Sequence, residues 1–117
     1  MIKTAGDDFK LVVVIVKKNL SREVIKACRK GGSEGGTVMQ GRGTGKKEIK
    51  GILGVEVEPE KDIILSLTPN EKIDSVMHHI TKCANLNEPG TGVAFIINSK
   101  SICGVAHLLD DDFSTND

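Results

Sequence analysis

The strongest constraint on the fold is an unbroken apolar segment near the N-terminus, KLVVVIVK at residues 10–17. Its β-branched side chains favour an extended strand, because branching at Cβ restricts side-chain rotation in a helix. A strand that is apolar at nearly every position is typical of the middle of a sheet covered on both faces. The run is also far too short to cross a bilayer. The chain is therefore expected to fold around a central strand at residues 10–17.

A helix is predicted next, followed by a second strand and a loop. The triplet Asn19–Ser21 offers N-cap chemistry, and the glycine pair at 31–32 can adopt the left-handed conformation that ends a helix. A strand is expected at residues 36–40. The segment GRGTGKKEIKG, residues 41–51, is glycine-rich and basic with no apolar period, which predicts a loop.

The second half of the chain repeats this alternation of strand and helix. The sequence Thr68–Pro69–Asn70–Glu71 matches a capping box, with a hydroxyl at the N-cap and a carboxylate three residues later. It predicts that a helix starts there. One face of that helix would carry Ile73, Val76, Met77, Ile80 and Ala84. Strands are expected at 52–57, 63–67, 93–97 and 101–108.

The order of these elements indicates an α+β fold of the ferredoxin-like βαββαβ type with an extra C-terminal strand. Two helices would pack on one antiparallel sheet. We expect a single domain at residues 10–108, with flexible termini at 1–9 and 109–117. Since a chain of 117 residues buries a limited share of its surface, oligomerisation would help to stabilise it.

Composition excludes some function classes. Lysine plus arginine and aspartate plus glutamate number 16 each, which argues against a generic nucleic-acid or membrane-surface binder. The three cysteines, Cys28, Cys83 and Cys103, form no CxxC pair and are interpreted as small core residues, reduced in the cytoplasm. His78 and His79 are consecutive on a helix and point about 100° apart. We find no catalytic or metal-ligating constellation.

Two glycine turns are the most informative features for function. Gly41, Gly43 and Gly45 alternate with other residues ahead of two lysines, and Gly90–Thr91–Gly92 precedes a predicted strand. Glycine lets the backbone approach an anion closely, and successive N–H groups can form an anion-binding nest. The spacing does not match a Walker A loop. The turns favour a phosphate-bearing ligand, and a solvated surface loop is the alternative for the first of them.

Residues 10–108 resemble the PII family of nitrogen-regulatory signalling proteins. The opening strand and helix match in length and pattern. RGTGKK at 42–47 resembles the family's entry to the T-loop, and GTGVAFII at 90–97 resembles its B-loop and the following strand. Lys61, just after Pro59, falls on the lysine that contacts nucleotide phosphates in the family.

The resemblance implies a cytoplasmic homotrimer without catalysis or a catalytic cofactor. It implies that ADP, ATP or AMP binds in clefts between subunits. The T-loop would then regulate a transporter or a metabolic enzyme in nitrogen or carbon metabolism. The nucleotide-binding residues carried over from the family are Thr37, Gly43, Thr44, Gly45, Lys46, Lys47, Lys61, Gly90, Thr91, Gly92 and Val93.

Several positions depart from the family pattern. The chain has no tyrosine, so the T-loop tyrosine that is uridylylated in the family is missing, and the loop is shorter. Val93 stands at the B-loop lysine, while Gly104 and Ala106 stand at two arginines of the last strand. A charge-assisted contact is worth about 1.5–3 kcal/mol, so these losses imply weaker triphosphate binding, carried mainly by Lys46, Lys47 and Lys61. Lys47 also replaces a glutamine that 2-oxoglutarate sensing requires.

Two other classes stay open on the residues alone. A CutA-like trimer that binds metal or a small molecule would bring His, Cys or carboxylate ligands together. A small enzyme of ferredoxin-like fold, such as a muconolactone-isomerase-like catalyst, would place an acid or base in a pocket.

Overall fold

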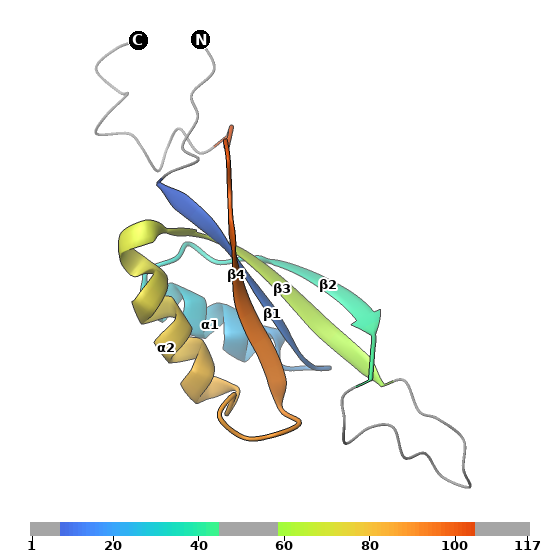
Figure 1. The fold of residues 1–117 in the computed structure, drawn as a ribbon. Helices are drawn as coiled ribbons and strands as arrows, with labels where there is room; N and C mark the ends of the chain where they lie inside the picture. The colour runs from blue at the N-terminus through green and yellow to red at the C-terminus, as the bar shows by residue number, and fades with distance from the viewer. Residues whose placement is uncertain (1–7, 45–58, 105–117) are drawn as a thin grey trace, which may run out of the picture.

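The computed structural model describes residues 8–44 and 59–104 (Figure 1). Their strands form one sheet in the order β2-β3-β1-β4, with every neighbouring pair antiparallel. Two helices on an antiparallel sheet make this an α+β fold, as predicted. The elements are β1 (Phe9–Lys17), α1 (Ser21–Gly31), β2 (Thr37–Arg42), β3 (Glu60–Pro69), the 3-10 helix η3 (Asn70–Lys72), α2 (Ile73–Cys83) and β4 (Gly92–Asn98).

The apolar run is the central strand that the sequence predicted. β1 pairs with β3 along its whole length, from Phe9 opposite Pro69 to Lys17 opposite Lys61. On its other side β1 pairs with β4, from Lys10 to Val16. Neighbours on both sides satisfy the backbone of β1. Its side chains alternate between the face that the helices cover and the opposite face, so within the described residues the predicted cover is found on one face only.

Both helices cover the same face of the sheet (Figure 1). Val12, Val14 and Val16 of β1 point toward them and are fully buried, because alternate residues of a strand share a face. The helix face predicted from Ile73, Val76, Met77, Ile80 and Ala84 is confirmed. The core between helices and sheet consists of Val12, Val14, Val16, Val24, Ala27, Cys28, Ile64, Ile73, Val76, Ile80 and Ala84.

The opposite face, here called the open face, is also apolar. Within the described residues no helix covers it (Figure 1). Phe95 and Ile97 of β4 are 41% and 46% exposed, and Met39 of β2 is 44% exposed. The register aligns these residues with further apolar side chains. The open face is made of Leu11, Val13, Ile15, Thr37, Met39, Gly41, Lys61, Ile63, Leu65, Leu67, Val93, Phe95 and Ile97.

The start of α1 differs from the prediction. Its N-cap is Leu20, and no side chain of the Asn19–Ser21 triplet caps it. The acceptor comes instead from β3, because Asp62 Oδ2 lies 3.0 Å from the backbone nitrogen of Asn19 and 3.2 Å from that of Ser21. The predicted end is confirmed: Gly32 has φ 117°, and its N–H donates to backbone oxygens of the last turn.

The predicted capping box at Thr68–Glu71 is wrong. Thr68 is fully buried in β3, and its hydroxyl donates to the backbone oxygen of Ser66 at 3.2 Å. The strand continues through Pro69 because β1 reaches Phe9 and pairs with it there, and the Asn70 N–H then donates to the Asp8 oxygen at 2.9 Å. A 3-10 turn follows, so α2 begins only at Ile73.

The end of the chain departs from the prediction as far as it is described. β4 ends at Asn98, and residues 101–104 belong to no strand. The rest of the predicted strand at 101–108, the predicted strand at 52–57 and nearly all of both predicted flexible termini lie outside the described residues. Among the helices that are described, none has the length and apolar character needed to span a bilayer.

The cysteine prediction holds for one of the three residues. Cys28 is buried in the core, whereas Cys83 and Cys103 are exposed. Cys83 occupies the last turn of α2 on the side away from the sheet, one position before the buried Ala84. The helical rotation of about 100° per residue places these two neighbours on different sides of the helix.

Candidate functional site

A hollow of about 480 Å³ lies where all four strands approach one another at one end of the open face. It brings together segments that are far apart in the sequence: the end of β2, the start of β3, the start of β4 and the second half of β1. Its lining residues are Ile15, Gly41, Arg42, Gly43, Thr44, Lys61, Ile63, Gly90, Gly92 and Val93.

The antiparallel register explains why these residues meet. Lys61 lies opposite Gly41 of β2, and two residues further along β3, Ile63 lies opposite Ile15 of β1. Ile15 in turn lies opposite Val93 of β4. Residues paired across a sheet share a face, so two adjacent rows of the open face bring a lysine and a glycine beside three apolar side chains.

The glycines that line the hollow differ in whether the fold itself requires glycine at their position. Gly90 and Gly92 have φ of 81° and 154°, and a Cβ at Gly92 would lie 2.6 Å from the Ile15 oxygen. The fold itself therefore requires glycine at 92. Gly43 has no atom within 4 Å of its Cβ position. Its bare backbone faces open space beside the hollow, where a ligand can approach closely.

The charge at the hollow is mainly positive. Lys61 is half-buried in its wall, and Arg42 is exposed at its edge. Beside them Lys18 Nζ lies 2.7 Å from Glu60 Oε2. The hydrogen bond from Lys18, and then its charge, holds the pKa of the Glu60 carboxyl below its ordinary value, and the same bond raises the pKa of Lys18. The hollow thus combines cations and accessible backbone with an apolar wall, an arrangement suited to an anionic ligand that also carries an apolar ring.

Comparison with known families decides the identity of the domain. The model of the family Nitrogen regulatory protein P-II matches residues 9–105, most of the chain. This chain belongs to the PII family. The resemblance seen in the sequence is confirmed, and the chain is a PII-like signalling protein of a family of regulators rather than enzymes. No individual curated protein matches the chain significantly.

The structure gathers most of the described residues that the PII resemblance pointed to. Gly43, Thr44, Lys61, Gly90, Gly92 and Val93 all line the hollow. They come from three separate stretches of the chain. The two glycine-containing segments singled out in the sequence thus meet at one hollow.

Other predicted residues lie elsewhere. Thr37 shares the open face but starts β2, four residues before Gly41, or roughly 13 Å along an extended strand. Thr91 does not line the hollow. Its hydroxyl lies 2.8 Å from the Asn85 oxygen and 3.0 Å from the Glu88 oxygen, so it donates its hydrogen bond within the loop. Gly45, Lys46 and Lys47 lie outside the described residues.

The sequence-based set missed four lining residues, Ile15, Gly41, Arg42 and Ile63. Gly41 and Arg42 belong to the same glycine-rich segment as Gly43, so a slightly wider motif would have included them. Ile15 and Ile63 are unremarkable apolar strand residues. They reach the hollow only because Ile15 pairs with both Ile63 and Val93, beside the pair that Lys61 forms with Gly41.

Another hollow, of about 710 Å³, lies between the two helices and holds none of the predicted binding residues. Within residues 8–44 and 59–104, no group of three or more His, Cys, Asp or Glu side chains could hold a metal ion.

Proposed function

We propose that this PII protein binds an adenine nucleotide, ADP, ATP or AMP, at the hollow on the open face. Binding would be reported through the T-loop, which follows Thr44, to a transporter or metabolic enzyme in nitrogen or carbon metabolism. The observation that carries the proposal is that three segments meet at one hollow of about 480 Å³, which is lined by residues 42–44, by Lys61, and by Gly90, Gly92 and Val93. These are the segments on which the family resemblance rests.

The lining has the chemistry that a nucleotide needs. Lys61 and Arg42 supply positive charge for phosphate oxygens, and the exposed backbone at Gly43 permits close approach. Ile15, Ile63 and Val93 form an apolar wall that suits the face of a purine ring. With Val93 at the family's B-loop lysine, we expect the phosphate contacts to be fewer, which favours ADP or AMP over ATP.

The open face supports assembly into a homotrimer of ferredoxin-like subunits. Val93, Phe95 and Ile97 of β4 are each more than 40% exposed although they are large and apolar. Contiguous apolar surface of this kind marks an interface in soluble proteins. A trimer built through the open face would cover these residues and place each hollow beside a neighbouring subunit, so that the nucleotide would bind between subunits. The free cysteines fit the reducing cytoplasm as the place of action.

Calorimetric titration of the purified protein with ATP, ADP, AMP and cyclic nucleotides tests the proposal. Lys61→Ala should lower the affinity for the tightest-binding nucleotide by about tenfold to a hundredfold, because it removes a charge-assisted contact. Lys100→Ala removes an exposed lysine outside the hollow and should leave the affinity unchanged. Absence of binding by every nucleotide at millimolar concentration, or equal affinity in Lys61→Ala, would reject the nucleotide site.

A further inference from the structure

A second hollow of the protein lies between α1 and α2, on the side of the helices that faces away from the sheet. Its volume is about 710 Å³. The two helices run antiparallel. Gly31 at the end of α1 contacts Val76 near the start of α2, and Glu23 in the first turn of α1 is close enough to Cys83 at the end of α2 to raise the pKa of its thiol. The groove is lined by Glu23, Lys26, Ala27, Lys30, His78, His79, Lys82 and Cys83.

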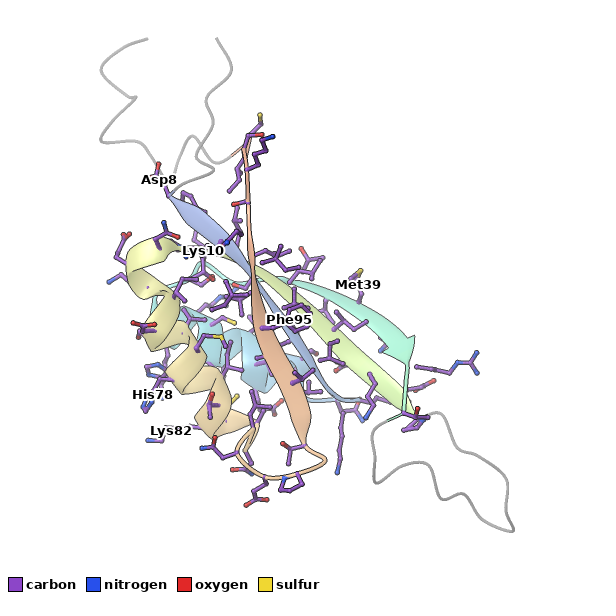
Figure 2. All side chains as sticks on the ribbon, in the orientation of Figure 1. Asp8, Lys10, Met39, His78, Lys82 and Phe95 are labelled. Atoms are coloured by element: carbon purple, nitrogen blue, oxygen red, sulfur yellow. The ribbon has the colours of Figure 1, made fainter. Side chains whose placement is uncertain are left out.

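The charge of this helix groove is strongly one-sided. It carries Lys26, Lys30 and Lys82 against the single carboxylate of Glu23, although the whole chain has a formal net charge of zero. Figure 2 shows His78 and Lys82 projecting from α2 on the side away from the sheet. The basic excess therefore comes from where the residues are placed on the helices rather than from overall composition, and it attracts acidic partners.

The floor of the groove includes the buried Ala27, and one of its polar side chains, His79, is held by a hydrogen bond. Ala27 is only 5% exposed at the base between the helices, and the lysine stems can lie along it while their ammonium groups stay in water. His79 Nδ1 donates to the Ser75 oxygen at 2.8 Å, which orients its ring. Partial desolvation between the helices, followed by the charge of Glu23, raises the pKa of the Cys83 thiol, so this cysteine stays protonated and presents a neutral surface.

The spacing of the lysines selects the shape of the ligand. Lys26 and Lys30 are one helical turn apart on α1, about 6 Å along the axis, and Lys82 lies across the groove on α2. A compact anion would contact one or two of these charges. An extended acidic chain can contact all three and place apolar side chains on the floor.

We propose that the helix groove docks an acidic peptide segment, with apolar residues between its carboxylates, from a protein partner. The groove lies on the opposite side of the sheet from the open face, so assembly through the open face leaves it accessible. The proposal does not depend on nucleotide binding, because the two hollows share no lining residue.

Fluorescence anisotropy of the full chain with a labelled peptide of alternating glutamate and leucine tests this docking. A peptide of alternating glutamine and leucine is the neutral control. The groove variant Lys26→Gln/Lys30→Gln/Lys82→Gln should bind the acidic peptide about tenfold more weakly, and added salt should weaken wild-type binding, because exposed charge pairs are individually weak and screened. The variant Lys10→Gln/Lys72→Gln/Lys100→Gln removes the same charge outside the groove and should bind as the wild type does.

Several results would overturn the proposal. If the wild-type protein did not bind the acidic peptide, or if the two triple variants lost the same affinity for it, the groove would not be its binding site. Displacement of the peptide by tripolyphosphate or by phosphatidylserine vesicles at matched charge would assign the groove to small anions or lipid instead. If only the groove variant changed its oligomeric state, the groove would instead be a contact between copies of this chain. Nucleotide affinity should stay the same in the groove variant, which separates this test from that of the nucleotide site.

Discussion

Asp62 on β3 caps the start of a helix that precedes it in the chain, with its Oδ2 atom 3.2 Å from the backbone nitrogen of Ser21. The same oxygen accepts the N–H of Asn19 at 3.0 Å. Asp62 is only 2% exposed, and its carboxylate accepts from the Ser21 amide, which the first turn of α1 leaves without a helical partner. Because Lys61 precedes Asp62, the cap ties the strand that carries the candidate binding lysine to the N-terminus of α1.

Replacing Asp62 by alanine should destabilise the protein by about 1–3 kcal/mol, since it leaves the part-buried amides of Asn19 and Ser21 without their acceptor. Urea denaturation measures this. Asp74→Ala is the matched control, because Asp74 lies exposed in the first turn of α2 and should change the stability by less than about 0.5 kcal/mol. Equal effects of the two substitutions would show that Asp62 acts only through its charge and not as a buried cap.

Gly31→Ala should destabilise the packing of the two helices. A Cβ at this position would lie 2.5 Å from the Cα of Val76, so the backbones would have to separate. Overpacking of this kind costs about 1–3 kcal/mol. Thermal or urea unfolding provides the measurement, and Gly43→Ala is its control, since its Cβ would meet nothing within 4 Å. If Gly31→Ala were as stable as Gly43→Ala, the close helix contact would be wrong.

Phe95→Lys should disrupt the proposed trimer without unfolding the subunit. Phe95 is 41% exposed on the open face of an edge strand, so a charge there is tolerated by one subunit but costly to bury between subunits. Sedimentation velocity should show a smaller species. Ser75→Lys adds the same charge on an exposed turn of α2 and should leave the assembly intact. A trimer that persists in Phe95→Lys would place the interface elsewhere.

The pair formed by Lys18 and Glu60 predicts a pH response with a definite sign. The hydrogen bond from Lys18 holds the pKa of Glu60 below its ordinary value. The stabilisation by this pair is therefore complete above the ordinary glutamate pKa, and it is lost as the pH falls through the lower value of the folded state. Carboxyl NMR titration should show the Glu60 pKa returning toward its ordinary value in Lys18→Gln. The change in stability should be small because both groups are exposed. An unchanged Glu60 titration in this variant would contradict the pairing.

The sequence predicted most but not all of the residues that line the hollow of the open face. Gly43, Gly90, Gly92 and Lys61 were predicted because glycine and lysine carry recognisable backbone and charge properties wherever they occur. Ile15 and Ile63 were missed because an isoleucine in a strand has the same local pattern whether it faces a ligand or a neighbouring subunit. Thr91 was assigned to the site, but its hydroxyl bonds to the Asn85 and Glu88 oxygens, partners that only the folded loop supplies.

Sequence alone determined the features that depend on neighbouring residues. The β-branched run fixed β1 as a strand, helical spacing fixed the buried face of α2, and Gly32 ended α1, because each follows from local sterics and periodicity. The tertiary structure decided the rest. The pairing of Pro69 with Phe9 kept Thr68 inside β3 instead of at a helix cap. Asp62 capped α1 from the other half of the chain. These outcomes depend on strand register, which joins residues far apart in sequence and is set by packing of the whole sheet rather than by any local pattern.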